Sequence, residues 1–436
     1  MSITSAEPAL LGLPALTATR PRIWTAIVVH GVVDFFSYLL IPLMPLLITR
    51  LSLTPGQSAA ILAAGSLSSG LIQPLVAWLS DRHNTRWLGT LGLVLAAAAY
   101  GLTGYAGSFS QLLLLQIIGA AGVGAFHPVA AAAVGQLSSA KRSLGVAMFF
   151  LGGMIGGITG NTAAPLYVRL VGLRELIYLI PFGLLAAAFL AWAIHGVPHA
   201  HAAARDEHAA LEPSERRWRW TAVWLLYLGN VLRFGVNAAL VYLIIEWTRG
   251  FVAASAGVDT ASASPQVLTE LSMKATSLNG PMQAAMQIGM GAAGISAGWL
   301  VRPSREKRAL ILVPIWGAIA IAAIAATDDF LAQLPALRGL IVPLVFALTV
   351  MAGIGFGGVI PVTISLSQRL LPHRTGLASG LMMGGAWGVG AAGPPLAEWL
   401  IHHWGLDAAF VITGSMLLIA GLASAAIPGW LIRKAA

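Results

Sequence analysis

Asp34 and His30 are the residues whose types and spacing offer the clearest chemistry. Both lie in an apolar run, from about 22 to 48, that is long enough to cross a membrane. A carboxylate in the middle of a membrane helix costs about 2.5–3.5 kcal/mol unless it is paired, hydrated or protonated, so it predicts a functional site. His30 precedes Asp34 by about one helical turn on the same face, and histidine changes charge near neutral pH. We predict that this pair exchanges or shares a proton; the alternative is a hydrogen-bonded pair that only fixes its helix.

His127 lies beside Pro128 in a glycine-rich stretch of another apolar run. We expect the proline to break the helix and to free backbone groups that line a cavity. His127 would then bind an anionic substrate. The alternative is a histidine whose ring nitrogens are satisfied by backbone carbonyls.

Arg233 is the only Lys or Arg that falls well inside an apolar run, and Asn230 and Asn237 lie one turn to either side of it. An unpaired guanidinium is costly in a membrane, so it should meet a carboxylate or an anionic ligand. We therefore predict substrate contacts for these three side chains. A structural ion pair between Arg233 and Asp34 is the alternative.

The remaining polar residues predict no metal, cofactor or enzyme site. Glu246 and Glu398 lie near the outer ends of their runs, where ordinary solvation explains them. The spacing of four histidines in one polar segment is not that of a tetrahedral zinc site: His195, His199, His201 and His208. The motifs Gly-x4-Gly-Lys-Ser/Thr, His-Glu-x2-His and Gly-x-Ser-x-Gly are absent, which argues against ATP use and against hydrolytic enzymes.

The composition indicates which elements position these residues. The chain has 436 residues, of which 57% are hydrophobic and 9% charged, whereas a soluble chain carries about 25% charged residues. A soluble domain and a disordered chain are both excluded. Near-continuous apolar runs favour membrane helices over barrel strands. We predict an all-α membrane protein with twelve transmembrane helices, at about 22–48, 57–79, 87–106, 110–135, 144–168, 176–196, 220–247, 277–301, 309–326, 339–366, 377–400 and 408–431.

Lys and Arg concentrate in alternate connections between these runs, including both ends of the chain. By the positive-inside rule, both termini are cytoplasmic and the protein is a multi-pass protein of the cytoplasmic (inner) membrane. This placement accounts for the net charge of +9 without any nucleic-acid partner. With no cysteine, the chain forms no disulfide.

The chain divides into two similar halves. Gly122-Val-Gly124, Pro128 and Gly152-Gly153 in the first half are repeated as Gly353-Ile-Gly355, Pro361 and Gly384-Gly385 in the second. Such duplicated bundles are typical of secondary transporters. We predict a cytoplasmic N-terminus (1–22), two pseudo-symmetric six-helix bundles (23–196 and 220–431), a cytoplasmic linker (197–219) and a tail (432–436).

Two further patterns concern packing and movement. Glycines recur every fourth residue at Gly152, Gly156 and Gly160, and again at Gly380, Gly384 and Gly388. Small residues at this spacing let helices approach closely, either as fixed packing or as smooth faces that let the halves rock. The outer segment 251–276, rich in Ala and Ser, is a candidate lid.

Motifs along the chain resemble a known transporter family. The loop Asp81-Arg82-His83-Asn84-Thr85-Arg86 is similar to the signature loop of the major facilitator superfamily, although Ala77, Asn84 and Trp87 depart from that pattern. The resemblance implies that Asp81, Arg82 and Arg86 form a charge latch that stabilises the outward-open state. Three further motifs resemble the fosmidomycin-resistance efflux group, which exports a phosphonate drug: His30-x3-Asp34 with Pro42 and Pro45, Gly124-Ala-Phe126-His127-Pro128, and the segment from Gln368 to Gly380. That group tends to have Asn where this chain has Val33.

The resulting hypothesis is a monomeric, proton-coupled antiporter that exports a small anionic or amphipathic compound by alternating access. Its partners would be the small-molecule substrate, protons and membrane lipid. Proton coupling is assigned to Asp34 and His30, and substrate contacts to His127, Arg233, Asn237 and Asn230. Two alternatives remain open, a proton-coupled uptake symporter with the same fold and an intramembrane enzyme that uses His and Asp.

Overall fold

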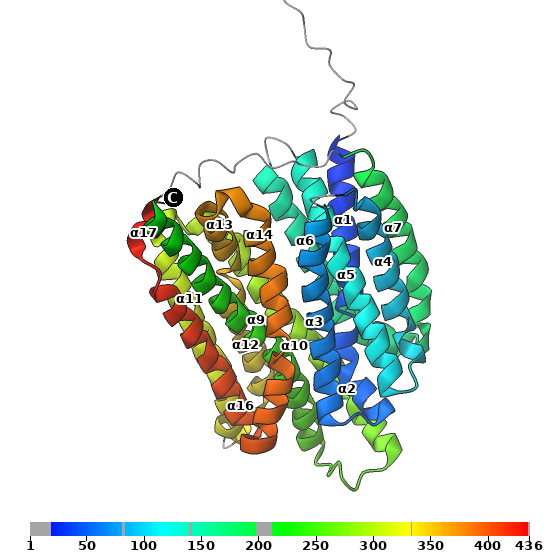
Figure 1. The fold of residues 1–436 in the computed structure, drawn as a ribbon. Helices are drawn as coiled ribbons and strands as arrows, with labels where there is room; N and C mark the ends of the chain where they lie inside the picture. The colour runs from blue at the N-terminus through cyan, green and yellow to red at the C-terminus, as the bar shows by residue number, and fades with distance from the viewer. Residues whose placement is uncertain (1–18, 81–82, 139–141, 198–211, 333, 435–436) are drawn as a thin grey trace, which may run out of the picture.

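A computed structural model describes residues 19–80, 83–138, 142–197, 212–332 and 334–434. These residues form helices joined by short turns and, within the described ranges, no strand. The helices run roughly along one direction and form an elongated bundle, with the start of α1 and the C-terminus at the same end (Figure 1).

The first half contains α1 (Thr19–Ser37), α2 (Leu40–Leu51), α3 (Pro55–Ser80), α4 (Arg86–Gly101), α5 (Phe109–Leu137), α6 (Arg142–Leu170) and α7 (Ile180–Ile194). The second half begins with α9 (Pro213–Ala256), α10 (Pro265–Leu300), α11 (Glu306–Ala332), α12 (Ile341–Gly357) and α13 (Ile360–Leu370). It continues with α14 (Thr375–Gly380), α15 (Ala386–Gly390), α16 (Gly393–Ala425) and α17 (Gly429–Lys434). A π-helical turn, Leu381–Gly385, joins α14 to α15.

The predicted all-helical membrane fold is confirmed, and each of the twelve predicted spans coincides with one or more of these helices. Ten described segments are long and apolar enough to cross a membrane. One of the ten covers 49 residues, Leu377–Ala425, and contains a break at Gly405, whose φ of 83° interrupts α16 between the eleventh and twelfth predicted spans. The other difference is α10, which carries buried polar side chains and is not among the ten.

The first span is divided directly after Asp34. The helix ends at Ser37 and resumes at Leu40. Pro42 explains this break, because proline has no N–H with which to bond the carbonyl of Tyr38, four residues earlier. The break places Tyr38 at a joint between α1 and α2.

The first glycine stripe packs α6 onto α1. A Cβ atom at Gly152, Gly156 or Gly160 would lie 2.5, 2.0 or 2.5 Å from a carbonyl oxygen of α1, those of Ile27, Gly31 and Phe35 respectively. Both helices therefore use a spacing of four residues at this contact, and only glycine permits it. This close contact fixes the position of His30 and Asp34 along the axis of α6.

The second glycine stripe packs between the halves. A Cβ atom at Gly384 would lie 3.0 Å from side-chain atoms of Gln73 and Pro74 in α3, and Gly388 faces the backbone of Gly70. The two stripes are repeated in the sequence, but one lies within the first half and the other at the boundary between halves. Only the second stripe therefore lies where it could take part in a movement of one half against the other.

The two halves repeat one contact at corresponding helix ends. The Arg86 guanidinium donates to the carbonyl of Val197, just after α7, and the Lys307 ammonium donates to the carbonyl of Ile427 at 2.7 Å, just after α16. Asp81 and Arg82, the other two predicted latch residues, lie outside the described residues. The latch is therefore still a prediction.

Two predicted connections differ from the structure. Most of the predicted linker 197–219 lies outside the described residues, but α9 begins within it, at Pro213. The predicted lid at 251–276 is largely helical, because α9 extends to Ala256 and α10 begins at Pro265. Only the short connection between these two helices is non-helical, so the segment is two helix ends joined by a turn.

Candidate functional site

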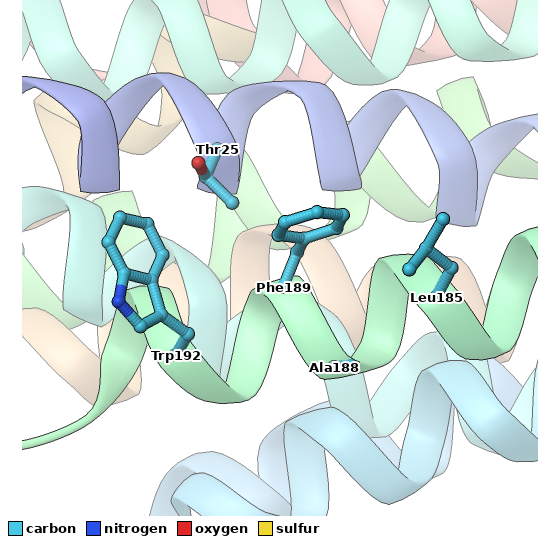
Figure 2. A pocket seen from close by; sticks show the side chains of 5 residues that line it. All are labelled: Thr25, Leu185, Ala188, Phe189 and Trp192. Atoms are coloured by element: carbon cyan, nitrogen blue, oxygen red, sulfur yellow. The ribbon is translucent and has the colours of Figure 1, made fainter.

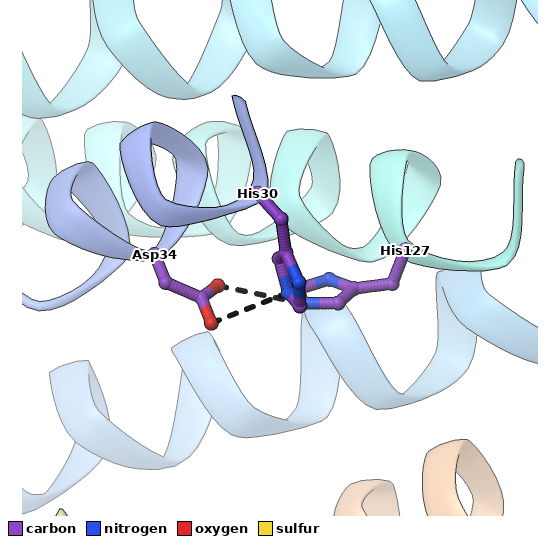
Figure 3. Close-up of side chains that lie close together, drawn as sticks. All are labelled: His30, Asp34 and His127. Carbon is purple, nitrogen blue, oxygen red and sulfur yellow. Dashed lines mark hydrogen bonds and ion pairs between the residues drawn. The ribbon is translucent and has the colours of Figure 1, made fainter. Parts of the chain in front are cut away.

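Three ionisable side chains from two helices meet inside the first half (Figure 3). The Nε2 atoms of His30 and His127 are 3.1 Å apart. One oxygen of Asp34 lies 3.4 Å from the His30 Nε2, and its other oxygen lies 3.4 Å from the His127 Nε2. The sequence predicted the pair on α1; the structure adds His127 of α5 as the third member of what we call the His30–Asp34–His127 triad.

The hydrogen bonds of the two Nδ1 atoms determine whether the Nε2 atoms in the triad carry hydrogen. Nδ1 of His30 lies 2.6 Å from the Phe149 carbonyl oxygen, and Nδ1 of His127 lies 2.8 Å from that of Val123. A carbonyl oxygen only accepts hydrogen bonds, so both Nδ1 atoms carry hydrogen. If both rings were neutral, two bare Nε2 lone pairs and a carboxylate would face one another. The arrangement therefore requires a proton or another cation among the three groups.

The triad is largely buried, and two of its three side chains are partly exposed. The exposed fractions of the side chains are 2% for His30, 16% for Asp34 and 23% for His127. The ring of His30 stacks on Phe149, with centroids 3.9 Å apart. On the side of α6 the space is kept by Gly153, where a Cβ atom would lie 2.5 Å from the Asp34 carboxylate.

Tyr38 brings α1 close to the second half. This residue follows Asp34 by four positions, and its side chain lies near that of Gln287 of α10. The face of α1 that carries the triad itself packs against His127 of α5 and Gly153 of α6, both in the first half.

Sequence reasoning missed a polar stripe on α10. Asn279, Gln283 and Gln287 recur every fourth residue, and all three are buried, with exposed fractions of 0%, 2% and 7%. Asn279 donates to the Ile41 carbonyl across the boundary at 3.1 Å, and Gln283 donates to Asn279 at 3.0 Å. The signal was present in the sequence, since three amides at a spacing of four in an apolar helix mark one face.

The predicted helix break beside His127 is wrong, because α5 continues through Pro128 from Phe109 to Leu137. Gly124, four residues before the proline, lets α5 pack closely on α3, since a Cβ atom there would lie 2.7 Å from the Ser69 carbonyl oxygen. His127 reaches the triad from an unbroken helix, with its Nδ1 held by the Val123 carbonyl.

Arg233 lies elsewhere, in the interior of the second half, and its side chain is fully buried. Its guanidinium donates to Asn230 Oδ1 at 3.2 Å, to the Leu310 carbonyl at 3.4 Å and to Ser424 Oγ at 3.3 Å. Its Nε has no partner, and no carboxylate of a described residue lies within 4.0 Å of it. The alternative of an ion pair with Asp34 is therefore not formed in this structure.

The two asparagines beside Arg233 have different surroundings. Asn230 is fully buried and donates to Thr363 Oγ1 at 2.8 Å and to the Met382 carbonyl at 2.9 Å. It holds α9 against α13 and the π-helical turn. Asn237, two turns further along α9, is 5% exposed. The structure brings Arg233 and Asn230 together but does not bring them to the triad.

Glu246 and Glu398, which the sequence places near the ends of their apolar runs, are both partly exposed. Glu246 pairs with Arg249 at 2.8 Å and is partly exposed.

A groove of about 490 Å³ between α1 and α7 is lined by Thr25, Leu185, Ala188, Phe189 and Trp192 (Figure 2). It contains no ionisable group, and its exposed aromatic side chains are typical of a surface that faces lipid.

Comparisons with known proteins agree with this architecture. A model of the Major Facilitator Superfamily matches residues 26–337 and, in a second match, residues 251–434. The Fosmidomycin resistance protein of Escherichia coli (strain K12) is 24% identical over 395 residues, which cover 89% of this chain and 88% of that protein.

Two solved structures show the same fold at low sequence identity. A D-xylose–proton symporter aligns with a TM-score of 0.66 and 14% identity, covering 95% of this chain and 98% of that one. A bacterial homologue of the human lysosomal transporter Spinster, in an inward-facing and unoccupied conformation, aligns with a TM-score of 0.65 and 15% identity, covering 97% and 98%. Since the family model spans both halves, the chain belongs to the major facilitator superfamily and is a multi-pass membrane transporter.

Proposed function

We propose that this transporter is a proton-coupled antiporter that exports a small anionic or amphipathic compound. The observation that carries the proposal is the His30–Asp34–His127 triad, whose three facing acceptor groups require a proton or another cation between them. A group that holds one proton in a partly accessible interior site is suited to take it up from one side of the membrane and to release it on the other.

Exchange requires that cargo and proton exclude each other at the triad. A cargo with a hydroxyl or amide donor would achieve this by donating to Asp34 in place of the shared proton. The partly exposed His127 and Asp34 are the triad members that a ligand reaches, so we assign the first contact with cargo to this side. Asn237, on α9 of the second half, is the proposed contact from the opposite bundle.

Arg233 is proposed to act on anionic cargo through its charge. Its two terminal nitrogens donate to Asn230, Leu310 and Ser424, so the planar fork is not free to clamp a head group in this conformation. A buried charge without a carboxylate partner nevertheless gives the second half a positive potential, because the low dielectric of the interior screens it weakly. Asn230 keeps the guanidinium in place.

The proton and the halves are coupled through Tyr38 in this proposal. Loss of the proton from the triad changes the charge beside Tyr38, and the side chain of Tyr38 lies near that of Gln287 in the other half. This contact gives the protonation state a direct route to the boundary where Gly384 and Gly388 meet α3. The halves are proposed to rock about that boundary, with Asp81, Arg82 and Arg86 as the inner latch.

The export direction is supported by the relationship to the fosmidomycin resistance protein. We place the transporter in the cytoplasmic membrane as a monomer with both termini inside, as the distribution of Lys and Arg predicts. A proton that moves inward releases about 2.3 kcal/mol per 100 mV, which is available to drive export.

Uptake by symport is the second candidate, and one observation favours it. An anionic group that accepts a hydrogen bond from the exposed His127 would bind better when the triad is protonated, so that cargo and proton would travel together. Everted membrane vesicles with radiolabelled fosmidomycin separate the two functions. Accumulation inside the vesicles under an inside-acid proton gradient supports antiport. Gradient-driven accumulation only in right-side-out vesicles with an inward proton gradient would establish symport instead.

A further inference from the structure

We infer that the His30–Asp34–His127 triad is also a binding site for a divalent transition-metal ion of the Zn²⁺ class. Among the described residues, it is the one group of three His, Asp or Glu side chains that offers a ligand atom from each within 4.8 Å of the others. The inference goes beyond the proposed transport function and does not depend on it, because it concerns what the three donors bind at equilibrium.

The donor set matches this class of ion. Two imidazole nitrogens and one carboxylate are typical ligands of Zn²⁺ and of neighbouring first-row ions, whereas Mg²⁺ and Ca²⁺ prefer sets made of oxygen alone. Asp34 turns one oxygen toward each ring, so it can bind through one oxygen or through both.

The spacing fits four-coordinate geometry. Bonds of about 2.0–2.2 Å around a tetrahedral ion place neighbouring ligand atoms about 3.3–3.6 Å apart. The closest separations in the triad are 3.1 Å between the two Nε2 atoms and 3.4 Å from each Nε2 to an oxygen of Asp34. The two 3.4 Å distances involve different oxygens of Asp34, so a turn of the carboxylate together with small shifts of the rings would bring all three groups into coordination.

The surroundings of the triad are those of a prepared metal site. Both Nδ1 atoms donate to backbone carbonyls, of Phe149 and Val123, which fixes the rings with Nε2 as the free ligand atom. Gly153 leaves the space beside the carboxylate and the His30 ring open. The exposed side of His127 and Asp34 provides a path of entry and a fourth position for water or cargo.

A bound ion would take the place of the shared proton. The positive charge that the three acceptors require would then come from the metal, so ion and proton would occupy the triad alternately. This relationship distinguishes the site from a permanent structural zinc site, which is closed by four protein ligands.

The test is Co²⁺ and Zn²⁺ binding to the full-length protein, purified in detergent without a histidine tag. We expect about one Co²⁺ per chain, with the intense visible absorption of a four-coordinate ion, and loss of that absorption when Zn²⁺ is added. His127→Gln and Asp34→Asn should each lower the affinity for Co²⁺ more than about tenfold. His127 is the partly exposed ligand, so its substitution is the one least expected to disturb folding.

Two control variants address the other histidines. The double variant His402→Ala and His403→Ala removes an adjacent pair whose rings are 4.9 Å apart, and it should bind Co²⁺ as the unaltered protein does. Replacement of His199, His201 and His208 by alanine should also leave the four-coordinate spectrum unchanged. A weak, six-coordinate Co²⁺ spectrum in the unaltered protein would overturn the inference, as would full binding by a folded His127→Gln variant. No transport is measured in this experiment. Its outcome therefore does not decide the vesicle test of the proposed function.

Discussion

Replacing Gly153 by alanine tests whether the exact spacing of the triad matters. The new Cβ atom would lie 2.5 Å from Asp34 Oδ2 and 2.6 Å from the His30 Nε2, whereas ordinary contacts begin at 3.4 Å. Either the carboxylate and the ring move by about 0.9 Å, or α6 withdraws from α1 and loses the close contacts at Gly152 and Gly156.

The expected magnitude follows from this displacement. Overpacking costs about 1–3 kcal/mol of folding stability, partly offset by the roughly 0.5–1 kcal/mol that alanine gains over glycine in a helix. The protein should therefore still fold. A displacement of about 1 Å in a site that transfers a proton costs on the order of 100-fold in rate. We predict that Gly153→Ala loses nearly all proton-coupled transport while its melting temperature falls by only a few degrees.

The assay is the initial rate of fosmidomycin transport in proteoliposomes under an imposed proton gradient, normalised to reconstituted protein. Gly385→Ala is the matched control, since Gly385 takes the corresponding place in the second half and an added Cβ atom there meets nothing closer than 3.6 Å. It should transport within about twofold of the unaltered protein. A Gly153→Ala variant that transports as fast as Gly385→Ala would refute the spacing argument.

The remaining predictions concern the second half and its link to the triad. Tyr38→Phe removes the hydroxyl that lies near Gln287 of α10. It should slow coupled transport at least tenfold with little change in fosmidomycin binding measured by thermal shift, and an unchanged coupled rate would exclude this link. Arg233→Met removes a charge that Arg233→Lys keeps. Because the interior of the protein screens a charge weakly, the Met variant should raise the KM for fosmidomycin about tenfold more than the Lys variant. Equal KM values in the two folded variants would count against a role for the charge.

Much of the fold was predictable because a membrane imposes simple requirements on the sequence. Apolar runs of sufficient length had to be helices, and the break between the eleventh and twelfth spans was expected where Gly405 interrupts α16. The internal repeat could also be recognised in the sequence, and the contacts of Arg86 and Lys307 correspond in the structure. The glycine stripes could not be assigned to packing partners from the sequence. The same spacing packs within a half at Gly156 and between the halves at Gly388.

The site was only partly predictable. His30 and Asp34 are neighbours on one helix, so their spacing was enough to pair them. His127 lies 97 positions from His30, and only the packing of α5 against α1 reveals that their Nε2 atoms meet. Arg233 was conspicuous in the sequence, but its partners, including Ser424 and the Leu310 carbonyl, come from helices whose order around the bundle the sequence does not state.

The central claim is that the triad carries the proton that moves with the cargo. The most direct measurement is proton flux driven by a fosmidomycin gradient in proteoliposomes, followed with a pH-sensitive dye, for the unaltered protein and for Asp34→Asn. We expect a proton flux in the unaltered protein and none in Asp34→Asn, while exchange of labelled for unlabelled fosmidomycin continues in both. An Asp34→Asn variant that moves protons at the unaltered rate would contradict the account.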